Sequence, residues 1–252
     1  MSDKNTLISG VPANVGGVLV KQPTLHEIFK VVGYDVYSTY IFVVGMTVEQ
    51  FLDSTGLRDA FDELPAEAKE QINSYELMLA EPSWRGLLLK ALSFFILGDV
   101  VFDDTQHRVM VIDDGGTATE ITKDVFVGIR GFVFQAACLK NETEKPKGYY
   151  NNAAKARYEK YLALKGEQEK NRVKKHDPDM EIWNLIGAVA AHSRGYTLIN
   201  IWELTVYQLY DQFGRINKQE YLDGYASKWA AWGTDKFDFD AWYKMSSEKN
   251  SK

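Results

Sequence analysis

Helix-start signals recur from one end of the chain to the other and constrain its architecture more than any other feature. Thr24 with Glu27, and Thr47 with Gln50, have the spacing of a capping box, in which each side chain binds the backbone N–H of the other residue. Further start signals are Pro65, Pro82, Thr122, the Asp177–Pro178 pair, and Asn200 with Glu203. They predict helices over 66–79, 83–97, 123–136, the stretch from 178 to a close at Gly195, and 201–215.

The hydrophobic period changes between residues 99 and 123, where short apolar runs alternate with Asp-Asp pairs. Gly115 and Gly116 are expected to supply the positive φ of a hairpin turn, which predicts a small antiparallel meander of two or three strands. The sequence VGGVLV at 15–20 predicts one more short strand. Residues 34–46 suit a helix and a strand equally, so both stay open. The expected fold class is mainly α, a helical protein with a small antiparallel β-meander near the middle of the chain.

A charged segment divides the chain into three expected parts. Residues 140–175 hold eleven basic and five acidic side chains and are therefore near +6, whereas the whole chain has a formal net charge of −6. This composition predicts a charged linker or an exposed helix. An N-terminal helical domain with a β-hairpin region is expected over 1–139, and a C-terminal aromatic-rich helical region over 176–252.

Composition indicates which classes of partner and which cellular compartment are expected. A pI near 5.3 argues against a nucleic-acid-binding domain, which is usually basic. The most apolar run, at 86–97, is shorter than the roughly twenty residues that a membrane span needs. A single cysteine, Cys138, suits a reducing compartment, and the first residues lack the pattern of a secretion signal. We therefore expect a cytoplasmic protein without a nucleic-acid or membrane partner.

The sequence contains no recognisable catalytic motif. Phosphate-loop, dinucleotide-binding, zinc-protease and serine-hydrolase patterns are absent. The Asp pairs at 103–104 and 113–114 are typical of turns, the HDPD sequence at 176–179 is typical of a helix start, and Cys138 is expected to pack as a small apolar residue. We predict no catalytic, cofactor-binding or metal-binding residue and no enzymatic activity; an enzyme with an unrecognised site is the competing class.

Aromatic residues are concentrated in the last fifth of the chain. The helical spacing of Trp202, Val206, Leu209, Phe213 and Ile216 is typical of a buried face, but a docking surface stays open for these residues. The aromatic residues that follow Ile216 are more numerous than one buried helix face requires. Trp and Tyr are also enriched where proteins bind one another. The predicted partner-binding residues are Trp202, Tyr210, Phe213, Tyr225, Trp229, Trp232 and Trp242.

Several sequence stretches resemble one family. These are KQPTLHEIF at 21–29, SWRGLLLKALSFFI at 83–96 with VVFD at 100–103, DPDMEIWNLIGAVAAHSRGYTLINIWELTVYQLYDQFGRI at 177–216, and FDFDAWYK at 237–244. In that order they resemble the phage tail assembly chaperones encoded by phages and prophages of Gram-positive bacteria. The charged segment at 140–175 departs from the pattern and leaves the details of partner binding open.

The resemblance implies a non-enzymatic, mostly helical protein of the host cytoplasm. Its partners would be the tape measure protein, which it would coat, and the tail tube protein, whose subunits it would help to recruit. Neither a cofactor nor a metal is implied, and a homo-oligomer is possible. The alternative is a structural virion component of the tail, such as a connector or baseplate piece.

Overall fold

The computed structural model describes residues 4–139 and 181–233, and these residues fall into two compact units. The described part of the first unit comprises 4–139 and 199–214, and that of the second comprises 181–198 and 215–233. The helices of the first unit are α1 (Lys4–Ser9), η1 (Glu27–Val32), α2 (Tyr34–Gly45), α3 (Val48–Thr55), α4 (Arg58–Asp62), α5 (Ala66–Gln71), α6 (Ser74–Ala80), α7 (Pro82–Phe95), α8 (Lys123–Ala136) and η3 (Ile201–Glu203). Helix α10 (Ile182–His192) lies in the second unit, and α11 (Val206–Trp232) begins in the first unit and continues into the second.

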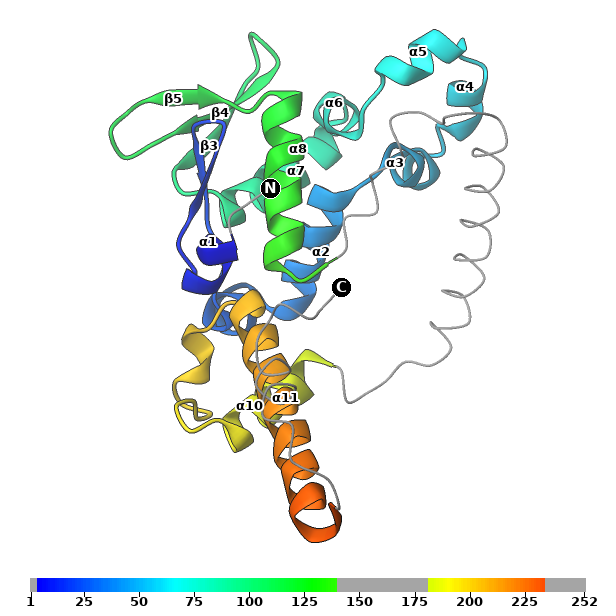
Figure 1. The fold of residues 1–252 in the computed structure, drawn as a ribbon. Helices are drawn as coiled ribbons and strands as arrows, with labels where there is room; N and C mark the ends of the chain where they lie inside the picture. The colour runs from blue at the N-terminus through cyan, green and yellow to red at the C-terminus, as the bar shows by residue number, and fades with distance from the viewer. Residues whose placement is uncertain (1–3, 140–180, 234–252) are drawn as a thin grey trace. The chain divides into compact units, whose positions relative to one another are not determined.

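The mainly α fold is confirmed, and so is the meander near the middle of the chain (Figure 1). Strands β3 (Asp99–Asp103), β4 (Arg108–Ile112) and β5 (Ala118–Glu120) pair antiparallel in that order. Gly116 has the predicted positive φ of 77°, but Gly115 does not lie in the left-handed region. Asp113 holds this turn instead, because its Oδ1 accepts hydrogen bonds from the N–H groups of Gly115 and Thr117 at 2.9 and 2.8 Å.

A second antiparallel sheet lies near the N-terminus, where one short strand was predicted. Strands β1 (Ala13–Val15) and β2 (Val18–Val20) form a hairpin, and Gly16 and Gly17 make its turn with φ of 59° and 92°. Two successive positive φ values are what the tight turn of a right-twisted hairpin requires, and glycine adopts them without steric cost. The VGGVLV sequence is therefore two strands joined by a turn.

The capping boxes at Thr24 and Thr47 are confirmed. Glu27 N–H donates to Thr24 Oγ1 at 3.1 Å and Thr24 N–H donates to Glu27 Oε2 at 2.9 Å, although the turns that follow are π-helical. Residues 34–46, which were left open, form helix α2 and its C-terminal end.

The single helix predicted over 66–79 is wrong, because the chain leaves the helical conformation at Ile72. Asn73 restarts it as α6 by accepting a hydrogen bond from Glu76 N–H at 2.9 Å. An Asn that caps a new helix competes with continuation of the old one, and here the cap prevails.

The core of the first unit forms where α2, α7 and α8 pack together (Figure 1). On α7, Leu88, Ala91 and Phe95 are at most 1% exposed, as their helical spacing predicts, whereas Trp84 is half-buried and packs on Phe51 with ring centroids 5.8 Å apart. The opposing helices contribute Val43 and Val44 from α2 and Ile129, Phe132 and Val133 from α8. The segment after β2 joins this core, because Lys21 N–H donates to the Phe95 carbonyl at 2.7 Å.

Two glycines of α8 provide a matched test of this packing. A Cβ added to Gly128 would lie 2.6 Å from Cγ1 of Val15, whereas a Cβ added to Gly131 would have nothing within 4 Å. We expect Gly128→Ala to lower the free energy of unfolding by about 1 kcal/mol, since overpacking outweighs the gain in helix propensity. Gly131→Ala is expected to raise it by about 0.5–1 kcal/mol. Urea unfolding of both variants measures the difference, and equal effects would contradict the contact between α8 and the hairpin.

The second unit contains α10 and the C-terminal part of α11. Ile182, Leu185, Ile186 and Val189 are buried on one face of α10, and His192 Nδ1 lies 2.7 Å from Glu220 Oε1 on α11. The predicted close at Gly195 is wrong: α10 ends at His192, and the Ser193 hydroxyl accepts hydrogen bonds from the N–H groups of Gly195 and Tyr196. Asp177 and Pro178 lie outside the described residues, and so does the charged segment 140–175.

Candidate partner-binding site

The long helix of the aromatic-rich region starts later than predicted, and this changes which residues share a helix face. Asn200 and Glu203 do not cap the long helix; Ile201–Glu203 forms the short 3-10 helix η3 instead. Helix α11 starts at Val206, and its capping box consists of Thr205 and Gln208, with hydrogen bonds of 2.9 and 3.2 Å between side chains and backbone N–H groups. Trp202 therefore does not lie on the same helix face as Val206 and Leu209.

The Thr205–Gln208 box was missed although its Thr-x-x-Gln spacing is visible in the sequence. Non-local pairing selects it over Asn200: Leu25 N–H donates to the Leu204 carbonyl at 2.7 Å, and Thr24 forms a β-bridge with Thr205. The Gln208 amide also donates to the Ile8 carbonyl at 2.8 Å. The start of α11 is thus fixed by two segments near the N-terminus of the chain, residues 24–25 and the end of α1.

Removal of this cap gives a local stability prediction. Thr205→Val keeps the shape of the buried side chain but removes the hydroxyl that accepts the Gln208 N–H. We expect the free energy of unfolding to fall by about 1 kcal/mol, which is typical of a lost N-cap. Thr39→Val is the control, because Thr39 is exposed in the middle of α2 and caps no helix. Thermal and urea unfolding of the two variants side by side measure the effect, and a neutral Thr205→Val would argue against the cap.

In the first unit, Trp202 belongs to an aromatic cluster built mainly by η1 and α2. The Phe29 ring stacks on Tyr34 with centroids 5.3 Å apart and meets Trp202 edge-on at 6.1 Å. Lys30 Nζ lies 4.4 Å from the centre of the Trp202 ring, a favourable cation–π distance. The Trp202 side chain is half-buried in these contacts.

The other predicted residues of the first unit are also partly or wholly covered. Val206 and Leu209 are buried, as the core interpretation predicts, and Tyr210 and Phe213 are half-buried. Burial, followed by the proximity of Cys138 and Tyr34, raises the pKa of Tyr210 above its ordinary value. This half of the predicted site is therefore largely packed against its own unit.

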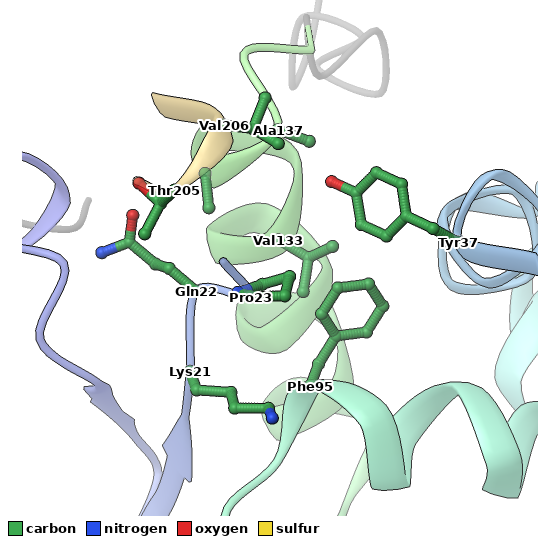
Figure 2. Close-up of a pocket in the computed structure, with 10 residues that line it drawn as sticks. Lys21, Gln22, Pro23, Tyr37, Phe95, Val133, Ala137, Thr205 and Val206 are labelled. Carbon is green, nitrogen blue, oxygen red and sulfur yellow. The ribbon is translucent and has the colours of Figure 1, made fainter. Parts of the chain in front are cut away.

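A small pocket lies beside the start of α11 (Figure 2). Its size suits a single water molecule. Its lining includes Gln22, whose Nε2 donates to the carbonyls of Thr6 and Val11 at 2.9 and 3.4 Å. The Oε1 atom of Gln22 is buried without a protein hydrogen-bond partner, so one bound water would complete its hydrogen bonding.

The predicted residues of the second unit are more exposed. Trp232 is 82% exposed, Tyr225 is 38% exposed and Trp229 is half-buried, and all three lie on α11. Tyr221, which was not among the predicted residues, is 65% exposed on the same helix, and its spacing to Tyr225 was a visible signal. Trp242 lies outside the described residues. The predicted set is thus divided between a packed cluster in the first unit and an exposed series in the second.

Asp103 and Asp113, one member of each Asp pair considered for catalysis, hold turns. Asp103 Oδ1 accepts hydrogen bonds from the N–H groups of Thr105 and Gln106, as expected of a turn residue. The expectation that Cys138 packs as an apolar residue is wrong: it is exposed just beyond the end of α8, with a φ of 56°. Neighbouring atoms desolvate its sulfur and raise the pKa of the thiol to about 11, so it is a poor nucleophile at neutral pH.

The described residues offer neither a metal site nor a membrane-spanning helix. Within 4–139 and 181–233, His, Cys, Asp and Glu side chains do not gather in threes in a way that could hold a metal ion. The helices of this part of the chain lack the length and apolar character that a membrane crossing requires.

The chain shares one segment with a known protein family. Residues 171–247 match the family described as the YomV second domain, so this part of the chain is similar to a domain of a phage-derived protein. The match includes α10, η3 and α11 and all seven predicted partner-binding residues. No curated protein and no solved structure matches the chain.

Proposed function

We propose that the chain is a non-enzymatic phage tail assembly chaperone that binds the tape measure protein and helps to recruit tail tube subunits in the host cytoplasm. The observation that carries the proposal is the exposed aromatic series of α11, which lies inside the segment similar to a phage-derived domain. An assembly chaperone must bind the apolar surfaces of unassembled subunits and release them later. Exposed Tyr and Trp side chains suit that task, because they combine apolar area with a polar group.

A structural virion component of the tail is the second candidate, since a phage-derived domain suits it equally well. The two candidates differ in the fate of the chain: a chaperone leaves when assembly is complete, whereas a structural component stays in the particle. A docking surface that is exposed in the isolated chain agrees with both candidates, because both would bind partners during assembly.

Quantitative peptide mass spectrometry on purified phage particles and on their lysate separates the two. If the chain assists assembly, its peptides will be abundant in the lysate and missing from the particles. If its peptides occur in the particles in a fixed ratio to the tail tube protein, the chaperone proposal fails and the structural role replaces it. Co-purification of the tape measure protein from the lysate with the tagged chain is the second measurement, and failure to recover it would remove the proposed partner.

A further inference from the structure

Helix α11 carries an exposed aromatic stripe in its second-unit part, formed by Tyr221, Tyr225 and Trp232. At 3.6 residues per turn these three positions lie within about 40° of one another around the helix axis. Tyr221 and Trp232 are 65% and 82% exposed, and Tyr225 is 38% exposed. Leu222, which is 1% exposed, marks the packed face of the same helix about 100° from Tyr221. The stripe therefore lies beside the packed face and is presented to solvent.

The charges of this part of α11 are distributed unevenly around the helix. Lys228 is exposed and lies between Tyr225 and Trp232 along the stripe, three residues after the one and four before the other. Lys218 lies about 60° from Tyr221 on the side of the packed face. Glu220 and Asp223, the acidic residues of α11 after Gly214, lie about 100° or more from Tyr221.

Both acidic residues also have partners away from the stripe. Glu220 Oε1 lies 2.7 Å from His192 Nδ1 on α10, and Asp223 Oδ1 accepts a hydrogen bond from Gln219 Nε2 at 2.9 Å. The stripe is thus aromatic, and Lys228 gives it a positive charge between Tyr225 and Trp232. Exposed apolar surface with a charge of one sign is typical of a docking site, and the charge selects a partner of the opposite sign.

From this arrangement we infer that the stripe docks an amphipathic helical segment whose apolar face is bordered by acidic side chains. Apolar residues of the partner pack on Tyr221, Tyr225 and Trp232, and a carboxylate beside them pairs with Lys228. The inference rests on the proposed function only in that the partner is a protein; it adds the chemistry by which that partner is recognised.

Binding of synthetic peptides to the full-length chain tests the inference directly. The probes are two amphipathic helices with the same leucine face, one bordered by glutamates and the other by lysines, and fluorescence anisotropy measures their affinities. The glutamate peptide is expected to bind about tenfold or more tightly, and added salt is expected to weaken it because salt screens exposed charges. Equal binding of the two peptides, or tighter binding of the lysine peptide, would overturn the inference.

Matched variants locate the binding on the stripe. Trp232→Ala is expected to weaken the binding of the glutamate peptide about tenfold or more, whereas Trp183→Ala, which removes a 50% exposed Trp of α10, is expected to leave it unchanged. Lys228→Ala is expected to weaken it about fivefold. Ala230→Glu makes the same change in net charge on the opposite side of the helix, and it is expected to have no comparable effect. Equal effects of the two charge variants would mean that net charge, and not the stripe, sets the affinity.

The peptide and particle experiments fail independently. Loss of the peptide preference with the chain still absent from particles would overturn the docking chemistry and leave the chaperone proposal standing. If the peptide preference is observed and the chain is also found in particles, the docking chemistry stands and the chaperone proposal fails.

Discussion

Phe95→Ala is expected to lower the free energy of unfolding by about 3–5 kcal/mol, the range typical of a deleted buried aromatic side chain. Phe95 is 1% exposed at the end of α7, and its ring lies 6.3 Å from that of Tyr37 on α2 and 5.1 Å from that of Phe94. Its backbone carbonyl also accepts the Lys21 N–H beyond the β1–β2 hairpin. The truncation would leave a cavity where two helices and the segment after β2 meet. Urea unfolding followed by circular dichroism measures the loss.

Phe42→Ala is the control for this prediction. Phe42 lies on α2 but is 49% exposed, so the same truncation removes much less buried area, and we expect a loss of less than about 1 kcal/mol. If Phe95→Ala does not fold, Phe95→Leu keeps most of the volume and is expected to cost about 1–2 kcal/mol. Equal losses for Phe95→Leu and Phe42→Ala would contradict the placement of Phe95 in the core.

Tyr75→Phe is the second large prediction, with an expected loss of about 1–3 kcal/mol. The Tyr75 hydroxyl donates to the carbonyl of Ile121 at 2.6 Å, in a buried position, and its ring stacks on Phe126 with centroids 4.6 Å apart. The substitution keeps the stacked ring and removes the donor, so the cost is that of a buried carbonyl deprived of this hydrogen bond. Tyr40→Phe, on a half-buried ring that packs on Phe94, is the control and is expected to be nearly neutral.

The pH dependence gives this prediction a second measurement. Burial, and to a smaller extent Glu120, raises the pKa of Tyr75 above its ordinary value of 10.0. The folded chain therefore keeps the proton that the unfolded chain loses above about pH 10, and stability falls as the pH rises through that region. The fall is expected to be smaller in Tyr75→Phe, which has no proton to lose at this position. An unchanged slope would show that the group is not buried as described.

Local hydrogen bonding explains which parts of the fold were predictable. The boxes at Thr24 and Thr47 and the cap at Thr122 each involve residues no more than three apart, so the sequence contains both members of the interaction. Asn200 and Thr205 offered competing starts for one helix, and the choice depends on pairing with residues 24 and 25, far away along the chain. The ambiguity at 34–46 was resolved in the same way, by burial of Val43 and Val44 where α2 packs with α7 and α8.

The candidate site was predictable in composition but not in exposure. Helical spacing identified the aromatic residues, and it could not show that Trp202 packs against Lys30 and Phe29 while Trp232 is exposed. Those differences arise from contacts of the folded unit. Lys228 was missed as a site residue because its importance depends on sharing the exposed side of α11 with Trp232, whereas the spacing of Tyr221 to Tyr225 was visible in the sequence.

The return of residues 199–214 to the first unit has a consequence for synthesis of the chain. The N-terminal segments leave the ribosome early, but the bridge from Thr24 to Thr205 and the hydrogen bond from Leu25 to Leu204 cannot form until the start of α11 has emerged. Until then, the apolar surfaces later covered by Leu204, Val206 and Leu209 stay open. Nascent chains arrested before residue 199 should therefore be more sensitive to protease in their N-terminal region than chains arrested well beyond residue 214, because only the longer ones can close the first unit.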